Sequence, residues 1–137
     1  MDDEDRRIAK ALVAHEVPNV SKPNLLKYRK FLLAQLGKST VLTGREDFPW
    51  EEMYVFGLGN KVEYERLKKD NPSYEDEYKL MGISDEYFDE NDLIALVERL
   101  SDGKCFEIGL SWLTTKDKKS KDFLPLDDFA TWVTNWC

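Results

Sequence analysis

Residues 93–113 read LIALVERLSDGKCFEIGLSWL, and this stretch decides the fold. Two apolar runs, 93–100 and 105–113, stand on either side of the dipeptide Asp102-Gly103. Asp-Gly between two runs rich in strand-forming residues is a strong signal for a β-hairpin, because both residues tolerate the positive φ angles of a tight turn. The stretch therefore predicts two antiparallel strands joined at this dipeptide.

A two-residue turn in this hairpin would set Val97 opposite Ile108 and Glu98 opposite Glu107. The first pair belongs to a mostly apolar face, which we expect to turn toward the core. The second pair brings two like charges together, which destabilises a sheet by some tenths of a kcal/mol. Three arrangements stay open for these carboxylates: both in water, a lysine between them, or a metal ion that bridges them.

Upstream of the hairpin, residues 1–37 predict two helices. The first covers 4–16 and carries acidic residues at its N-terminal end, where the helix dipole favours them. The second begins after Ser21, a good N-cap residue, and its apolar side chains recur at helical spacing. Gly37 is a natural end for this second helix.

After these helices the chain takes on the composition of strands. The β-branched run 39–43 and the aromatic run 53–56 are predicted strands. A helical insertion is predicted over 60–70, with Asn60 as its N-cap. The next segment, 74–83, fits a strand or a turn of helix.

The C-terminal segment carries one apolar face, made of Phe129, Trp132, Val133 and Trp136. Their spacing is typical of a short helix or 3₁₀ turn, with Asp127 as its expected N-cap. Buried apolar area contributes about 25 cal/mol per Å². We therefore expect this face to lie in the core.

Together these elements predict an α+β protein with a single domain over residues 1–137. The helices of 1–37 brace a small, partly open antiparallel β-barrel over 38–137. The barrel part contains the helical insertion and ends in a short C-terminal helical turn.

The composition limits what the protein can do. Its 137 residues carry a net charge of −7, with 42% hydrophobic and 34% charged residues, as in globular domains. No apolar run is long enough to span a membrane, and the N-terminus lacks the apolar core of a signal peptide. Two cysteines cannot make a disulfide framework, so we expect a cytoplasmic protein. Neither a membrane nor a nucleic acid is an expected partner, whereas the negative charge allows a cation or a basic protein.

The negative charge is concentrated in residues 71–103, which hold ten acidic and two basic residues. A solvated acidic loop explains such a run, and so does a cation site. Four side chains within it offer the oxygen ligands that calcium prefers: Asp85, Asp89, Asn91 and Asp92. Their spacing is not that of an EF-hand loop. They are the metal ligands that the sequence predicts.

A second group of carboxylates surrounds the turn at Pro49. It consists of Glu46, Asp47, Glu51 and Glu52. Either group can bind calcium weakly, and neither has a diagnostic spacing.

Catalytic motifs are missing from the sequence. His15 is the only histidine, which excludes a His-rich metal site. Cys105 falls within a predicted strand and is expected in the core, whereas Cys137 is expected to be an exposed thiol. The Gly-rich corner after Phe56 lacks the Gly-Lys-Ser/Thr of a P-loop. We therefore predict that the protein is not an enzyme, with a small hydrolase that uses paired carboxylates as the third alternative.

Several segments share a pattern with a known family. A strand ends near an arginine in 97–100, a strand of alternating apolar residues follows in 106–110, and an acidic and aromatic segment, 127–132, comes last. Upstream, a helix rich in tyrosine and leucine, 28–36, leads into a β segment. This order resembles a small bacterial family of acidic calcium-binding proteins with an SH3-like barrel.

The resemblance covers residues 24–44 and 93–136, with a long insertion between them. Two positions depart from the family pattern: Phe129 stands in place of a tryptophan, and Gly37-Lys38 replaces a Phe-Pro. The resemblance implies a highly bent SH3-like barrel and calcium binding, but it assigns no calcium ligand in this chain.

From the residues and the resemblance we expect a small acidic binding or regulatory module of the cytoplasm that binds calcium weakly. The alternative is a protein-interaction module of the adaptor or immunity type, whose acidic face meets a basic protein. A calcium-dependent change in tryptophan fluorescence or in melting temperature separates the two.

Overall fold

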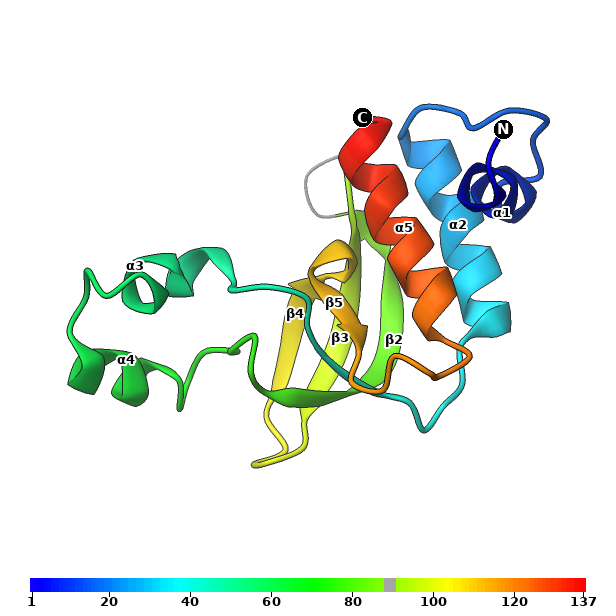
Figure 1. Cartoon of the computed structure of the whole chain (residues 1–137). Coiled ribbons are helices and arrows are strands. Elements are labelled where there is room, and N and C mark those ends of the chain that lie inside the picture. The colour runs from blue at the N-terminus through cyan, green and yellow to red at the C-terminus, as the bar shows by residue number, and fades with distance from the viewer. Residues whose placement is uncertain (88–90) are drawn as a thin grey trace.

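The predicted hairpin belongs to a five-stranded antiparallel sheet with the strand order β4-β3-β2-β1-β5 (Figure 1). The structure is a computed structural model that describes residues 1–87 and 91–137. The strands are β1 (Val41–Gly44), β2 (Glu77–Tyr87), β3 (Leu93–Arg99), β4 (Cys105–Gly109) and β5 (Leu113–Thr115). With the helices beside this sheet, the protein is of the α+β class, as predicted.

The hairpin loop is longer than the sequence predicts. The Arg99 N–H donates to the Lys104 carbonyl at 2.7 Å, which makes the loop two residues longer than a tight turn. Glu98 therefore faces Cys105, and the expected pair of Glu98 and Glu107 does not form. A shift by two positions keeps each side chain on its face of the sheet, and the alternating burial along β3 confirms the expected core face.

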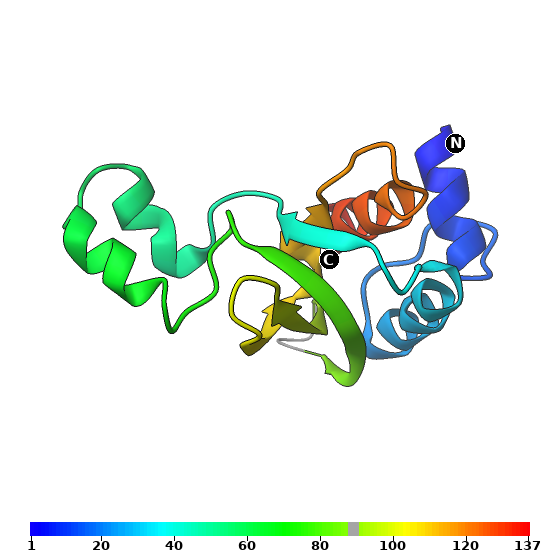
Figure 2. The same ribbon diagram turned by 90° about the horizontal axis from the view of Figure 1, so that it is seen from below.

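The sheet is strongly bent but is not closed into a barrel. The predicted strand 105–113 divides, because a 3₁₀ turn, η2 (Leu110–Trp112), redirects the chain after β4 so that β5 pairs with β1. Register shifts after Leu80 and Ile83 bend the long β2 (Figure 2). Strands β4 and β5 remain as edges, so the expected barrel is present only as a bent, open sheet.

Three helices form a layer beside the sheet, with α2 and α5 next to each other and α1 across them (Figure 1). Their bounds are α1 (Asp3–Ala11), α2 (Lys22–Gln35) and α5 (Phe123–Asn135). Ser21 caps α2 as predicted, because its hydroxyl accepts the Asn24 N–H at 3.4 Å. The Arg29 side chain donates to the Ile83 carbonyl at 2.8 Å and so ties α2 to β2.

Two helix boundaries differ from the prediction. Helix α1 ends before the expected residue 16, at a point where Val13 adopts a φ of 53°. Helix α5 has 13 residues and is not a short turn. It begins at Phe123, so Asp127 lies inside the helix and does not cap it.

The core lies between the helices and the sheet, and aromatic rings form its centre. Trp132 and Phe129 of α5 are fully buried, and both ring centroids lie 5.1 Å from that of Tyr28 on α2. The Trp132 indole N–H also donates to the Pro18 carbonyl at 2.8 Å. The expected burial of this C-terminal face is confirmed, with Trp136 partly buried at its end.

Between β1 and β2 the chain forms a projecting unit, residues 45–76, which we call the arm (Figure 1). Its elements are η1 (Pro49–Glu51), α3 (Glu52–Val55) and α4 (Lys61–Leu67). Helix α4 is the predicted insertion, and the Asn60 side chain caps it as expected by accepting the N–H groups of Val62 and Glu63.

Helix α3 replaces the predicted strand 53–56, which is therefore wrong. Pro49 has the φ of a helical first turn and opens η1, from which the chain continues directly into α3. The helical turn brings Tyr54 onto Tyr64 of α4, with parallel rings whose centroids are 5.0 Å apart. This packing across the arm outweighs the local preference of the aromatic run for a strand.

Candidate functional site

The structure describes three of the four predicted calcium ligands. Asp85 is exposed on β2, and Asn91 is exposed before β3. Asp92 is buried, whereas Asp89 lies outside the described residues. The loop therefore remains a prediction.

Asp92 already has a structural role. One carboxylate oxygen accepts the N–H groups of Leu93 at 2.8 Å and of Ser111 at 3.2 Å, and the other accepts the Ser111 hydroxyl at 2.6 Å. A side chain at Gly109 would come within 2.7 Å of the second oxygen and would displace this carboxylate. Asp92 thus fastens η2 to the start of β3.

The acidic stretch 71–103 is less negative in space than along the sequence. Lys68 and Lys116, which lie outside it, form ion pairs with Glu75 and Glu77. Two of its ten acidic residues are thus paired with lysines that lie outside the stretch.

Arg99 is the most heavily bonded side chain of this region, and it fixes the arm to the hairpin. Its buried guanidinium pairs with Asp76 at 3.0 Å and with Asp102 at 2.7 Å. It also donates to three carbonyls at the C-terminal end of α4, those of Lys68, Lys69 and Asn71. The Arg99 hydrogen bond lowers the pKa of Asp102 from 3.8 to about 2.

The carboxylates of the second predicted group, around Pro49, do not converge on one point among the described residues. Glu51 is fully buried, and its carboxylate accepts the Tyr64 hydroxyl at 2.6 Å, the Ser73 hydroxyl at 2.7 Å and the Tyr74 N–H at 2.8 Å. Burial, followed by this bond to Glu51, raises the pKa of Tyr64. With the Trp50 indole, which donates to a backbone carbonyl at 2.7 Å, these bonds organise the inside of the arm.

One cluster of carboxylates does converge among the described residues, and sequence reasoning missed it. Glu4 in the first turn of α1 meets Asp127 and Asp128 of α5, with ligand oxygens within 4.8 Å of one another. Burial raises the pKa of Glu4, and the charges of Asp128 and Asp127 raise it further. The two segments are at opposite ends of the sequence, so no local spacing signals the cluster.

Two arginines occupy much of this acidic cluster. Arg7 binds both oxygens of Asp128, at 2.7 and 3.0 Å, and Arg45 binds Asp127 at 2.7 Å. Three carboxylates therefore share two guanidinium groups, which leaves little charge to attract a cation.

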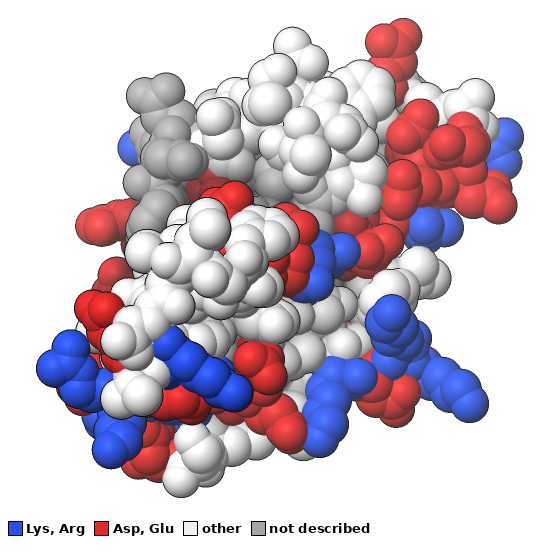
Figure 3. All heavy atoms as spheres, turned by 60° about the vertical axis from the view of Figure 1, so that its left-hand side comes forward, with Lys and Arg blue, Asp and Glu red and all other residues white. Residues whose placement is uncertain are grey.

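The tip of the arm displays a dense group of apolar side chains. Phe56 is 67% exposed, Leu58 82% and Val62 78%, and Met53 and Val55 are also exposed. Figure 3, in which the arm faces the viewer, shows an uncharged area bordered by basic and acidic side chains. We call these five residues the apolar tip. Local sequence patterns do not reveal it, because they predict a strand over 53–56 and a helix over 60–70.

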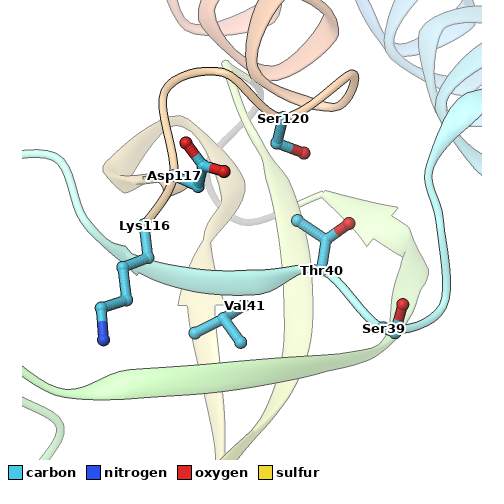
Figure 4. Close-up of a pocket in the computed structure, with 6 residues that line it drawn as sticks. All are labelled: Ser39, Thr40, Val41, Lys116, Asp117 and Ser120. Atoms are coloured by element: carbon cyan, nitrogen blue, oxygen red, sulfur yellow. The ribbon is translucent and has the colours of Figure 1, made fainter.

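A shallow hollow of about 520 Å³ lies between the start of β1 and the segment that precedes α5 (Figure 4). It is lined by Ser39, Thr40, Val41, Lys116, Asp117 and Ser120. Lys116 pairs with Glu77 at 2.9 Å, and Asp117 accepts the Lys119 N–H at 2.9 Å. The Thr40 hydroxyl donates to Asp122, and the Ser120 hydroxyl accepts the Asp122 N–H at 3.2 Å. Most polar side chains of this hollow are thus engaged with the protein itself.

The remaining reactive side chains lie on the surface. His15 and Cys137 are exposed, and so is Cys105, which corrects the expectation of a core cysteine. Cys105 lies on the outer face of the edge strand β4, opposite Glu98.

Among the described helices, none has the length and apolar character needed to cross a bilayer. Comparisons with protein families, with curated proteins and with solved structures find no match to this chain.

Proposed function

We propose that the protein is a protein-interaction module whose docking surface is the apolar tip of the arm. The observation that carries this proposal is the exposure of Phe56, Leu58 and Val62, together with that of Met53 and Val55, within ten residues of chain. Exposed apolar side chains are common singly, but a contiguous group on a projecting unit is typical of an interaction site. Phe56 is the expected anchor, because aromatic side chains dominate binding energy at interfaces.

The arm is preorganised for this role. The buried Glu51 carboxylate, the stacked rings of Tyr54 and Tyr64, and the Arg99 clamp hold the arm independently of any partner. A surface that is already ordered loses less entropy on binding, which favours affinity. The charged residues around the tip have both signs, with Glu52, Lys61 and Glu63 all exposed, so a mixed polar rim is expected on the partner.

The connectivity of the sheet supports an SH3-like arrangement, as the sequence resemblance implies. The strand order β4-β3-β2-β1-β5, with a 3₁₀ turn between β4 and β5, is that of SH3-like barrels, and the arm would then be the insertion between the first two strands. Modules of this kind recognise other proteins. A cytoplasmic location agrees with two exposed free thiols, which a reducing compartment would preserve.

The test compares two matched pairs of substitutions. Phe56→Asp with Leu58→Asp removes the apolar tip, and Leu33→Asp with Leu124→Asp changes two leucines that are each 48% exposed on helices α2 and α5. Both double variants should keep the far-UV spectrum and melting behaviour of the wild type, because exposed sites tolerate substitution.

With the purified proteins as bait in a lysate of the source cells, quantitative mass spectrometry should find the same enriched proteins for the wild type and the helix variant. The tip variant should lose them. Unchanged enrichment with the tip variant would contradict the proposal.

Weak calcium binding is the second candidate function, and the cluster of Glu4, Asp127 and Asp128 favours it. Affinity would be on the order of 10⁻⁵–10⁻³ M, because Arg7 and Arg45 compete with the ion for the same oxygens. Calorimetric titration of calcium at low ionic strength tests it. Heat that disappears in Asp127→Asn assigns the ion to this cluster, heat that disappears only in Asp89→Asn assigns it to the predicted loop, and no heat from the wild type ends the hypothesis.

A further inference from the structure

We propose that the free edge of β4 binds an extended basic peptide as an added strand, separately from the apolar tip. The peptide would place an apolar side chain beside Cys105 and a lysine or arginine beside Glu107, two residues further along. Main-chain hydrogen bonds supply affinity in such a complex, and alternate side chains supply specificity.

The backbone of β4 is ready to accept a strand. In the described sheet β4 has one neighbour, β3, so its other side is an edge. The Arg99 N–H bonds to the Lys104 carbonyl, which makes these two residues a hydrogen-bonded pair. Antiparallel pairing alternates, so Phe106 also bonds to β3, whereas the N–H and C=O groups of Cys105 and Glu107 point to the free edge.

A groove lies next to this edge on the outer face of the sheet. It holds about 320 Å³ and is lined mainly by Met81, Leu96, Cys105 and Phe106. Met81 is 55% exposed although it is apolar. A side chain of an added strand that faces Cys105 would project on the same side of the sheet and over the groove, since paired residues share a face.

The charges around the groove select a basic occupant. Glu107 lines the groove, and Glu98 lies on the same face of the neighbouring strand, opposite Lys79 of β2. Within the described residues neither carboxylate takes part in an ion pair. An apolar groove rimmed by the Glu107 carboxylate complements a strand that carries an apolar and a basic side chain two residues apart on the same face.

A second copy of the chain fits this edge poorly. Each copy carries a net charge of −7, and pairing β4 with itself would bring two Glu107 side chains close together. Like charges near each other across a ladder are destabilising. The occupant is therefore a peptide segment of a basic protein.

The two free cysteines make the test direct, because Cys105 lies at the proposed site and Cys137 at the far C-terminus. The probe is a blocked hexapeptide with threonine at every second position and alternating valine and lysine between, so that valine and lysine share one face of the strand. The control is the same peptide with glutamate for lysine. Alkylation of both thiols by iodoacetamide is followed by mass spectrometry. At about 1 mM the basic peptide should slow alkylation of Cys105 by about fivefold and leave Cys137 unchanged, as expected for a dissociation constant of about 0.25 mM.

A pair of substitutions separates strand addition from simple charge attraction. Glu107→Gln removes the charge, and Glu107→Pro also removes the outward N–H, which edge strands tolerate because no ladder bond to β3 is lost. The glutamine variant should weaken peptide protection of Cys105 about threefold, and the proline variant should abolish it. Hydrogen exchange of the Glu107 N–H in the wild type, slowed by the peptide, gives the same answer without any substitution.

Three results would overturn the proposal: equal slowing of both cysteines, equal protection by the acidic peptide, or full protection in Glu107→Pro. A concentration-dependent dimer in sedimentation that the proline change abolishes would assign the edge to a second copy and also overturn it. The tip variant, Phe56→Asp with Leu58→Asp, should bind the peptide as the wild type does. A negative result for peptide binding at β4 therefore leaves the proposed function of the arm untouched.

Discussion

The helix-and-sheet core and the arm differ in what lies at their centres. The core encloses the aromatic rings of Trp132, Phe129 and Tyr28, as the hydrophobic effect requires. The arm encloses the charged Glu51 and presents Phe56 and Leu58 to solvent. A chain segment that buries a carboxylate while exposing an aromatic ring is organised by hydrogen bonds and by ring stacking, and its apolar surface is left for another molecule.

The largest effect is expected in the core. Trp132→Ala should lower the free energy of unfolding by about 3–5 kcal/mol, because it removes a fully buried ring and leaves the Pro18 carbonyl without its donor. Chemical denaturation followed by circular dichroism measures it. A loss below about 1 kcal/mol would mean that the helix layer is not a packed core, and the contrast with the arm would disappear.

A smaller loss is expected when the polar centre of the arm is removed. Glu51→Ala leaves the hydroxyls of Tyr64 and Ser73 and the Tyr74 N–H without their acceptor, which should cost about 2–3 kcal/mol. Hydrogen exchange should place the loss within residues 45–76. Glu51→Gln keeps one acceptor oxygen and should lose less, so an equal loss in both variants would argue against the hydrogen-bond network as the cause.

The stability contributed by the pair of Arg99 and Asp102, beside the join between the arm and the core, should decrease in acid. The pKa of Asp102 is lowered from 3.8 to about 2 by its bond to Arg99, so the folded state gains stability above pH 3.8 and loses it as the pH falls toward 2. Asp102→Asn should therefore flatten this part of the stability profile. Denaturation series from pH 5 to pH 2 measure it, and identical slopes for wild type and variant would show that the pairing of Asp102 with Arg99 does not contribute to stability.

The smallest effect belongs to the acidic cluster beside the core. The pKa of Glu4 is raised by burial and by Asp128 and Asp127, so its neutral form is favoured by folding and the contribution is lost as the pH rises through that pKa. Glu4→Gln should therefore raise the melting temperature slightly at pH 7 and low salt, and the gain should vanish below pH 4. A decrease at pH 7 would mean that Glu4 makes a favourable contact that charge alone does not explain.

Patterns that are local in sequence predicted the elements of the fold well. The periodicity and cap of α2, the Asn60 cap of α4 and the face of the hairpin all depend on neighbouring residues, and all are confirmed. The turn at Asp102-Gly103 was predicted too short, because the bond between Arg99 and Lys104 closes a longer loop. That error left every side chain on its correct face, since a shift by two conserves the alternation.

Features that depend on distant contacts could not be predicted. The run 53–56 has the composition of a strand, but packing of Tyr54 on Tyr64 makes it helical. The cluster of Glu4 with Asp127 and Asp128 forms only because α1 crosses α5. The apolar tip could not be predicted for a related reason, because the composition of 53–56 predicts a strand and only the folded arm places Phe56 in solvent.

Hydrogen exchange of the free wild-type protein tests most directly the claim that the arm is ordered without a partner. The Tyr74 N–H, which donates to buried Glu51, and the Tyr64 N–H, which donates to the Asn60 carbonyl, report on the arm, and the Leu36 N–H, bonded to Leu32, reports on the helix layer. We expect both arm amides to exchange at least about 30-fold slower than an unfolded peptide, which corresponds to an opening free energy of about 2 kcal/mol, with Leu36 slower still. Exchange of both arm amides at unfolded rates, with Leu36 protected, would contradict the account.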